Sequence, residues 1–375
     1  MTSEWNHFAL GEITELVIDY RGKTPKKLGG DWCKQGYRAL SAKNIKTGRI
    51  VQAETIRYID ESLYRKWMKD EVQRGDILIT SEAPFGQIFF WDSDEKIVLS
   101  QRLFCVRIKP EYDARFIYYY MTTPEFQSEL DGRATGTTVI GLRQPELMKC
   151  IIRCPEIQEQ KVIAAILSSI DAKIIANEKV NDNLQQQAQA IYSSMFIDNP
   201  DPAWSHGHLS DLITVKYGKD HKKLADGIYP VYGSGGIMRY VERPLYNKES
   251  VLIPRKGTLN NVMYVNQPFW SVDTMFYTEM KLPNVAKFVY RFVKAKDLAS
   301  MNAGSAVPSM TTDILNAMEV VIPSVSALEE FESLVAPMYE AMEANDVQSK
   351  ALSQMRDTLL PKLMSGEIDV SAVQL

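Results

Sequence analysis

The chain has 375 residues, of which 45% are hydrophobic and 24% are charged, and its formal net charge is −4. These values predict two or three globular domains and exclude a disordered or fibrous protein. The most apolar stretch, 162–176, is too short and too charged for a membrane span, and no signal-peptide pattern precedes it. We expect a cytoplasmic protein with reduced, mostly buried cysteines and no metal site, because the cysteine spacing fits no zinc signature.

The charge is distributed unevenly along the chain. Residues 1–155 carry 23 Lys and Arg against 21 Asp and Glu, and residues 203–323 carry 14 against 10. Residues 156–202 carry 3 against 7, and residues 324–375 carry 3 against 9. Local clusters of basic residues matter more for phosphate contact than the total charge does. The acidic total therefore does not exclude a nucleic-acid partner.

Residues 1–155 form the first predicted domain. Between Leu16 and Ile50 it has nine Lys and Arg against two Asp, set among turn-forming Gly and Pro residues. Basic loops on a rigid scaffold can follow phosphates and place a side chain in a DNA groove, where Arg suits guanine and Asn suits adenine. For each single residue, a solvated surface position is an equal alternative. The candidate DNA contacts are Arg21, Lys23, Lys26, Lys27, Arg38, Lys43 and Asn44.

Residues 156–198 are predicted to form the first long helix. From Ile163 to Met195, residues at alternating steps of four and three form a largely apolar seam, which is the heptad pattern of a coiled coil. Asn177 interrupts the seam near its middle. A polar residue in such a seam costs stability but fixes register and orientation. The alternative is that Asn177 is solvated at the edge of the seam.

Residues 199–323 form the second predicted domain. Its apolar segment 251–254 leads into a basic turn that contains Gly257 and two Asn, a pattern typical of a groove reader. Trp270 and Phe276 lie in β-rich stretches and are predicted to be core residues before base-stacking ones. The candidate DNA contacts are Lys216, Lys219, Lys222, Lys223, Arg255, Lys256, Thr258, Asn260 and Asn261.

Residues 324–366 repeat the first helix. A shift of 168 positions carries its seam onto residues 331–363 and places Asn345 at the position of Asn177. Pro337 and Pro361 fall inside this second helix, and a kink or a restart is expected at each.

The order of the parts predicts how the two helices pair. The first helix leads to the second domain and the second helix begins there, so helices that pack through their seams are antiparallel. Asn177 and Asn345 then meet at one level, and the tail, 367–375, returns toward the first domain.

The domains repeat as well. The shift of 168 also superposes 136–155 on 304–323 without a gap, whereas the domain starts, Leu10-Gly-Glu-Ile and Leu209-Ser-Asp-Leu, match at a shift of 199. The difference of 31 residues predicts extra loops in the first domain. The expected fold is α+β, with two β-rich mixed target-recognition domains joined by an antiparallel pair of long coiled-coil helices in a pseudo-two-fold internal repeat.

Taken in order, these motifs resemble the specificity subunit of a type I restriction–modification enzyme. The resemblance is carried by Cys154-Pro-Glu-Ile-Gln-Glu-Gln, Leu167-Ser-Ser-Ile-Asp and the ending Leu359-Leu-Pro-Lys-Leu-Met-Ser-Gly-Glu-Ile. Within the domains, Arg21-Gly-Lys-Thr-Pro and Tyr229-Pro-Val-Tyr-Gly-Ser-Gly-Gly resemble two subtypes of its target-recognition domain. The start of the second helix is a looser match that lacks the Glu-Gln pair.

The resemblance implies a non-catalytic subunit that reads a split DNA sequence with one domain per half. It implies two docked adenine methyltransferase subunits, with a motor–nuclease subunit as an optional further partner. S-adenosylmethionine and ATP would bind those partners, and this chain would need no cofactor.

The residues themselves leave two alternatives open. The sequence lacks a Gly-x-x-x-x-Gly-Lys-Ser/Thr loop and the Asn/Asp-Pro-Pro-Tyr/Phe tetrapeptide of amino-methyltransferases. A stand-alone DNA-binding adaptor or repressor and a coiled-coil scaffold for protein partners would also lack both.

Overall fold

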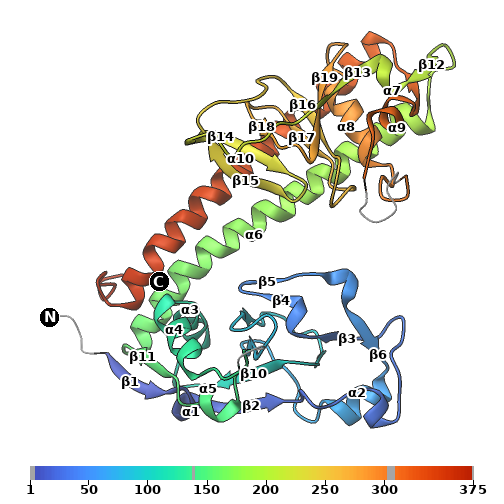
Figure 1. Ribbon diagram of the computed structural model, residues 1–375. Helices are drawn as coiled ribbons and strands as arrows, with labels where there is room; N and C mark the ends of the chain where they lie inside the picture. Colours follow the sequence, from blue (N-terminus) through green and yellow to red (C-terminus); the bar gives the residue numbers. More distant parts are fainter. Residues whose placement is uncertain (1–4, 137–139, 302–308, 374–375) are drawn as a thin grey trace. The chain divides into compact units, whose positions relative to one another are not determined.

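The computed structural model describes residues 5–136, 140–301 and 309–373. The chain divides into two compact units, which are residues 1–176 with 348–375 (unit 1) and residues 177–347 (unit 2) (Figure 1). The division passes through both long helices, so each unit contains one predicted domain and a part of each helix. The predicted repeat segments around Gly136 and Gly304 fall partly on 137–139 and 302–308, outside the described residues.

The described residues of unit 1 form two larger sheets and two two-stranded ones, of which β4-β5 is a hairpin. A four-stranded sheet has the order β2-β10-β7-β8, a three-stranded sheet has the order β6-β3-β9, and β1 pairs with β11. The strands are β1 (Asn6–Ala9), β2 (Thr14–Asp19), β3 (Tyr37–Leu40), β4 (Ile45–Lys46), β5 (Arg49–Ile50), β6 (Arg57–Ile59), β7 (Ile77–Thr80), β8 (Ile88–Phe90), β9 (Ile97–Leu99), β10 (Leu103–Ile108) and β11 (Ile151–Cys154). The helices are α1 (Leu10–Ile13), α2 (Glu61–Trp67), α3 (Ala114–Met121), α4 (Pro124–Arg133) and α5 (Gln144–Leu147), with short 3-10 turns at Lys26–Leu28, Ala42–Asn44 and Ala53–Thr55.

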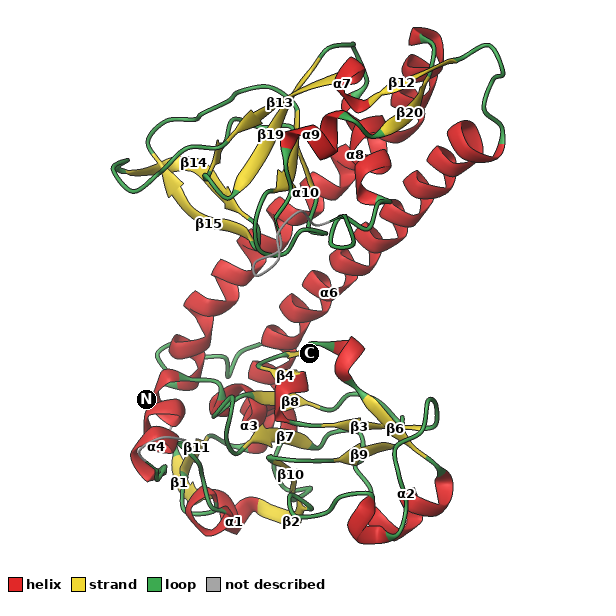
Figure 2. Ribbon diagram, turned by 45° about the vertical axis from the view of Figure 1, so that its right-hand side comes forward, coloured by secondary structure: helices red, strands yellow, loops and turns green. Residues whose placement is uncertain are grey.

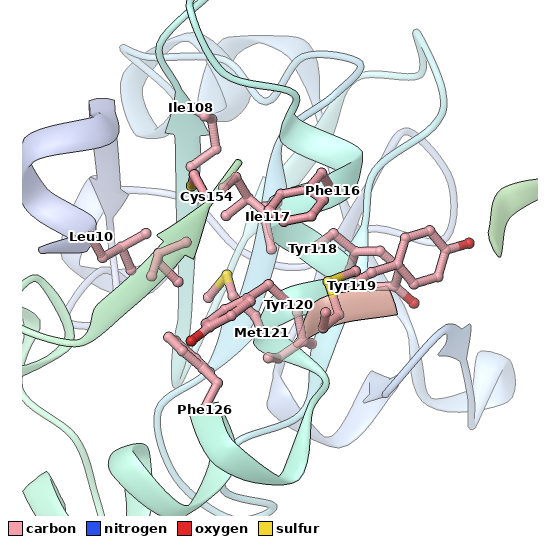
Figure 3. Packing of buried hydrophobic residues seen from close by; sticks show 14 of the residues in the cluster. Leu10, Ile108, Phe116, Ile117, Tyr118, Tyr119, Tyr120, Met121, Phe126 and Cys154 are labelled. Atoms are coloured by element: carbon pink, nitrogen blue, oxygen red, sulfur yellow. The ribbon is translucent and has the colours of Figure 1, made fainter. Parts of the chain in front are cut away.

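The central strand β7 shows how the sequence builds this core. Ile77 and Ile79 face the core around α3, whereas Leu78 faces the core around α2, because successive side chains of a strand point to opposite faces. Helix α3 begins at the side chain of Asp113, which accepts a hydrogen bond from the backbone of Phe116. Figure 3 shows the aromatic residues of α3 in the same buried cluster as Ile108 of β10 and Cys154 of β11.

Unit 2 has an equivalent four-stranded sheet, three-stranded sheet and two-stranded pair (Figure 2). Its four-stranded sheet has the order β13-β19-β16-β17, its three-stranded sheet has the order β15-β14-β18, and β12 pairs with β20. The strands are β12 (Ser205–His208), β13 (Ile213–Tyr217), β14 (Asp226–Gly233), β15 (Gly236–Val241), β16 (Ser250–Pro254), β17 (Met263–Val265), β18 (Trp270–Ser271), β19 (Met275–Met280) and β20 (Glu319–Ile322). The helices are α7 (Leu209–Leu212), α8 (Ala286–Lys294) and α9 (Thr312–Asn316).

The four-stranded and three-stranded sheets of the two units are equivalent strand by strand, and the pair β1-β11 corresponds to β12-β20. Each three-stranded sheet contains one parallel pair, β3 with β9 and β14 with β18. Residues 20–76, which lie between β2 and β7, are 57 in number, whereas the equivalent segment 218–249 has 32. Most of the predicted excess in the first domain therefore lies here, where it forms α2 and the β4–β5 hairpin. The α+β class and the internal repeat are confirmed.

The long helices are α6 (Ile157–Ser193), which ends in a π-helical turn at Ser194–Asp198, and α10 (Val325–Met364). In unit 1, Leu167 near the start of α6 shares a core with Leu363 near the end of α10. In unit 2, Tyr192 near the end of α6 shares a core with Phe331 near the start of α10. Within each unit the helices therefore pair antiparallel, as predicted.

Three further predictions can be compared with the structure. Of the kink or restart expected at Pro337 and Pro361, the restart does not occur, because α10 runs unbroken through both. Trp270 and Phe276 are buried core residues, as predicted. The cysteines are free thiols, three of them buried, and no helix within the described ranges is long and apolar enough to cross a membrane.

Candidate nucleic-acid interface

The loop after β2 carries four candidate DNA contacts, of which two form contacts within the protein and two are exposed. Arg21 forms an ion pair with Asp19 at 2.8 Å, and its guanidinium lies 4.1 Å from the centre of the Phe104 ring. Lys23 donates to the carbonyl oxygen of Trp67 at 2.5 Å, and burial, followed by the charge of a neighbouring lysine, lowers its pKa. Both side chains hold the loop in place. Beyond them, Lys26 and Lys27 are exposed on the 3-10 turn.

The next candidates lie at the end of β3. Arg38 forms a bidentate ion pair with Glu95, which reduces the positive charge that it offers to DNA. Asn44 is only 1% exposed, and its side chain accepts from Ser41 and donates to Thr55 at 3.0 Å. The structure therefore removes Asn44 from the candidate DNA contacts, because its amide is used inside the turn. Lys43, next to it, is exposed.

Lys43 lies at a polar hollow of about 190 Å³ that the sequence did not reveal. Gln101 and Arg102 line the same hollow and are exposed, although they are far from Lys43 in the sequence. The parallel pairing of β3 with β9 brings the two segments together, and the backbone of Ala42 donates to Gln101 at 3.1 Å. Gln and Arg are residue types that read adenine and guanine, and Arg102 is here paired with Glu82 at 3.1 Å. Gln101 and Arg102 lie outside the basic cluster at 16–50, and only the sheet pairing identifies them.

The second domain has an exposed lysine turn between β13 and β14. Lys219, Lys222 and Lys223 are exposed there, and the indole of Trp270 anchors the turn by donating to the carbonyl oxygen of Lys219 at 2.8 Å. Lys216 lies on β13 and forms an ion pair with Glu279 at 3.6 Å. The turn is therefore the better phosphate-contacting element.

The loop after β16 is built around Gly257. Its φ of +86° favours glycine, and a Cβ atom there would lie 2.8 Å from the hydroxyl oxygen of Ser234. Arg255 donates to the backbone carbonyl oxygen of Asp273 at 3.3 Å. A carbonyl oxygen has no net charge, so this contact does not neutralise the guanidinium. Lys256 and Thr258 are exposed. This loop therefore presents its cations at the position where β16 ends.

Two other candidates in this loop are used to hold it. Asn260 donates to Asp297 at 3.0 Å and accepts from the backbone of Ala299 at 2.9 Å. Asn261 donates to the carbonyl oxygen of Ser234 at 2.8 Å. Each donated hydrogen bond uses one of the two N–H donors of the side-chain amide, so both residues help to hold the loop, and their contact with bases stays a prediction.

A test of carboxylate pairing separates the remaining cations. Arg21, Arg38 and Lys216 have a carboxylate partner. Across the described parts of the chain, a second group of candidates has no carboxylate oxygen within 4.0 Å: Lys26, Lys27, Lys43, Lys219, Lys222, Lys223, Arg255 and Lys256. The lysines at 26–27 and at 219–223 follow the equivalent strands β2 and β13, whereas Lys43 follows β3 and the pair Arg255 and Lys256 follows β16, which corresponds to β7.

The asparagines of the helix seam lie together in unit 2. Asn177 is 2% exposed and donates to the backbone oxygen of Asn345 at 3.4 Å, and Asn345 donates to the side chain of Asn181 at 2.8 Å. Asn181 in turn donates to Asp346 at 2.8 Å. Asn177 and Asn345 thus lie at one level of the helix pair, and Asn177 is not a solvated edge residue.

Comparison with known proteins places this architecture in a family. The family model for the type I restriction modification DNA specificity domain matches residues 2–186 and again 203–330. The chain is similar to the type I restriction enzyme MjaIX specificity subunit of Methanocaldococcus jannaschii, with 24% identity over 79% of this chain and 78% of the relative. It is also similar to the HindI specificity subunit of Haemophilus influenzae, with 20% identity over 80% and 88%.

Structural comparison agrees at the level of the fold. The crystal structure of a type I restriction–modification system S subunit from M. genitalium matches 96% of each chain with a TM-score of 0.63 at 19% identity. Two matches of the family model in one chain correspond to the two repeated units. The chain therefore belongs to the family of type I restriction modification DNA specificity domain proteins.

Proposed function

We propose that this chain is the DNA-recognition subunit of a type I restriction–modification complex and reads a bipartite duplex target with one recognition domain per half-site. The observation that carries the proposal is the presence of exposed or half-exposed cations at strand ends in both domains. The two topologically equivalent domains each present cations without a carboxylate partner on loops at strand ends. The side chains that surround these cations differ between the two domains. Such cations contact phosphates, and the neighbouring side chains supply base discrimination.

The proposal assigns the chemistry to partner subunits. Two adenine methyltransferase subunits would dock on this chain and bind S-adenosylmethionine, and motor–nuclease subunits, where present, would bind ATP. We further propose that the complex is cytoplasmic, where it meets DNA. The family membership and the absence of nucleotide- and methyltransferase-type motifs in the sequence support this division of labour.

A selection experiment tests the recognition of DNA. The purified chain is used to enrich binders from a random library of duplex DNA, and the enriched DNA is sequenced. The expected result is two short, unlike blocks separated by a fixed run of unread bases. One continuous block, or no enrichment, would contradict a bipartite reader.

Substitution in the loop after β16 tests the interface itself. Lys256→Gln should lower affinity about equally for all DNAs and reduce the slope of log K against log salt by about 1, because one phosphate contact is lost. Lys179→Gln is the matched control, since Lys179 is an exposed lysine of α6 in the same unit. Equal effects of the two substitutions would place this loop away from DNA.

A methylation assay separates the proposal from its alternatives. The chain alone should transfer no methyl group, and adenine methylation at the selected sequence should need the added methyltransferase subunit. Specific binding without any such partner activity would favour the stand-alone repressor. Absence of specific binding would favour the protein scaffold.

A further inference from the structure

We propose, on the basis of the function proposed above, that the tip of the β14–β15 hairpin inserts Ile237 and Met238 into a DNA groove as an apolar reader of the second half-site. The two residues are consecutive in the sequence, yet they are 49% and 60% exposed. Two neighbouring exposed apolar side chains beside unopposed cations form a small apolar patch with a polar rim, which is the pattern of an interaction site. The groove of duplex DNA is the partner that the surrounding charge selects.

A β-bulge explains why both side chains are exposed. Val231 pairs with Arg239, and Tyr232 pairs with Ile237, so that Met238 is the extra residue of the bulge. In a regular strand one of two consecutive residues would face the core, but a bulge re-aims the side chains at its position. The hairpin therefore directs two neighbouring apolar groups away from the core.

Glycine at position 233 fixes how Met238 lies. A Cβ atom on Gly233 would lie 2.5 Å from the sulfur of Met238, so the methionine side chain lies over this glycine. Met238 thus packs over the backbone near the tip while 60% of it stays exposed. A positioned apolar group can discriminate between base edges, whereas a freely moving one discriminates poorly.

The tip is attached to the basic loop after β16. Ser234 lies in the turn of the hairpin, its hydroxyl group is close to Gly257, and its carbonyl oxygen accepts from Asn261 at 2.8 Å. The apolar pair and the cations Arg255 and Lys256 therefore belong to one connected surface. Cations that contact phosphates would place the hairpin at the groove, where the methyl group of thymine is the apolar feature of a base edge.

The equivalent link in unit 1 has the opposite character. Residues 41–56 join β3 to β6, and among them Lys43 and Lys46 are exposed whereas no large apolar side chain is. The apolar pair is therefore specific to the second domain and is not a requirement of the shared fold.

Alanine substitution of both residues tests the inference. DNAs selected by the wild-type chain are varied one base pair at a time through both half-sites, and binding is measured for Ile237→Ala/Met238→Ala. The expected result is a loss of about 5- to 100-fold in affinity for the selected DNA, with lost discrimination at one or two base pairs of a single half-site. The salt slope should not change, because no phosphate contact is removed.

Ile228→Ala is the matched control. Ile228 is 78% exposed near the other end of the same hairpin, and its replacement should leave affinity unchanged. If the double variant behaves like Ile228→Ala, or loses affinity equally on all DNAs, the inference is wrong while the proposed function stands. If the wild-type chain selects no DNA, the proposed function fails first, and the two results are distinct. Because all three side chains are exposed, the variants are expected to fold.

Discussion

In each unit the recognition domain is attached to the helix pair, but the side chains that make the attachment differ between the two units. In unit 1, Tyr119 of α3 donates to Asp171 of α6 at 2.7 Å, and Arg356 of α10 donates to the same carboxylate at 2.8 Å. The shift of 168 that relates the helices carries Asp171 onto Tyr339 and Arg356 onto Ala188. The polar triad of unit 1 thus has no counterpart in unit 2.

Unit 2 uses a lysine and a cluster of aromatic rings instead. Lys287 of α8 is buried and contacts Glu332 of α10 at 2.6 Å. Phe196, Phe288 and Phe331 pack edge to face, with ring centres 4.9 to 5.2 Å apart. Burial raises the pKa of Tyr119 in unit 1 and of Tyr339 in unit 2, so both phenols stay neutral.

The comparison shows that the repeated fold does not require particular side chains where a domain packs on the helices. It requires only that the contact is well packed and that its polar groups have hydrogen-bond or ion-pair partners. Because the two contacts carry different polar groups, a helix segment from one unit would leave charges unpaired in the other. The difference specifies which half of each helix belongs to which domain. Four substitutions test this comparison.

The largest effect is expected for the aromatic cluster of unit 2. Phe331→Ala should lower the free energy of unfolding by about 3–5 kcal/mol, because it leaves a cavity among buried rings. Leu334→Ala, at an exposed position of the same helix, should change it by less than about 0.5 kcal/mol. Urea unfolding measures both, and similar losses for the two variants would show that the cluster is not what holds unit 2.

Removal of the shared carboxylate tests unit 1. Asp171→Ala should lower the free energy of unfolding by about 1–3 kcal/mol, since Tyr119 and Arg356 lose their common acceptor in a partly buried place. Asp171→Ala combined with Arg356→Ala should cost less than the sum of the single effects, as expected for coupled partners. Strict additivity in this cycle would mean that the pair contributes nothing as a pair.

A smaller effect is expected for the asparagines of the helix seam. Asn345→Ala removes the hydrogen bond to Asn181 and should cost about 1 kcal/mol. If Asn177 and Asn345 set the register of the helix pair, Asn177→Leu should also change the cross-linking pattern of cysteines placed along α6 and α10. An unchanged pattern would limit these residues to local hydrogen bonding.

The smallest effect is expected at Asp346. Partial desolvation raises the pKa of Asp346, and the charges of Glu178 and Glu343 raise it further. Because its pKa is higher in the folded state, the ionised group opposes folding at neutral pH, and Asp346→Asn should stabilise unit 2 by less than about 0.5 kcal/mol. The gain should shrink as pH falls through the folded pKa. A gain that persists in acid would have another cause.

The sequence determined the architecture because periodic burial leaves a direct trace in residue order. The seam from Ile163 to Met195, its copy 168 positions later and the matching domain ends were sufficient for the antiparallel helix pair and the repeat. The basic loops could also be predicted from the sequence, because the charged residues of a cluster lie close together along the chain.

The roles of individual loop residues were decided by the tertiary structure. Asn44 and Asn261 are of a residue type that can read adenine, but their side-chain amides form hydrogen bonds that hold turns. The parallel pairing of β3 with β9 places Gln101 at the same hollow as Lys43. A bulge in β15 makes Met238 the extra residue of that strand, and its side chain is exposed. Hydrogen-bond partners and sheet register connect residues distant in the sequence, so no local pattern specifies them.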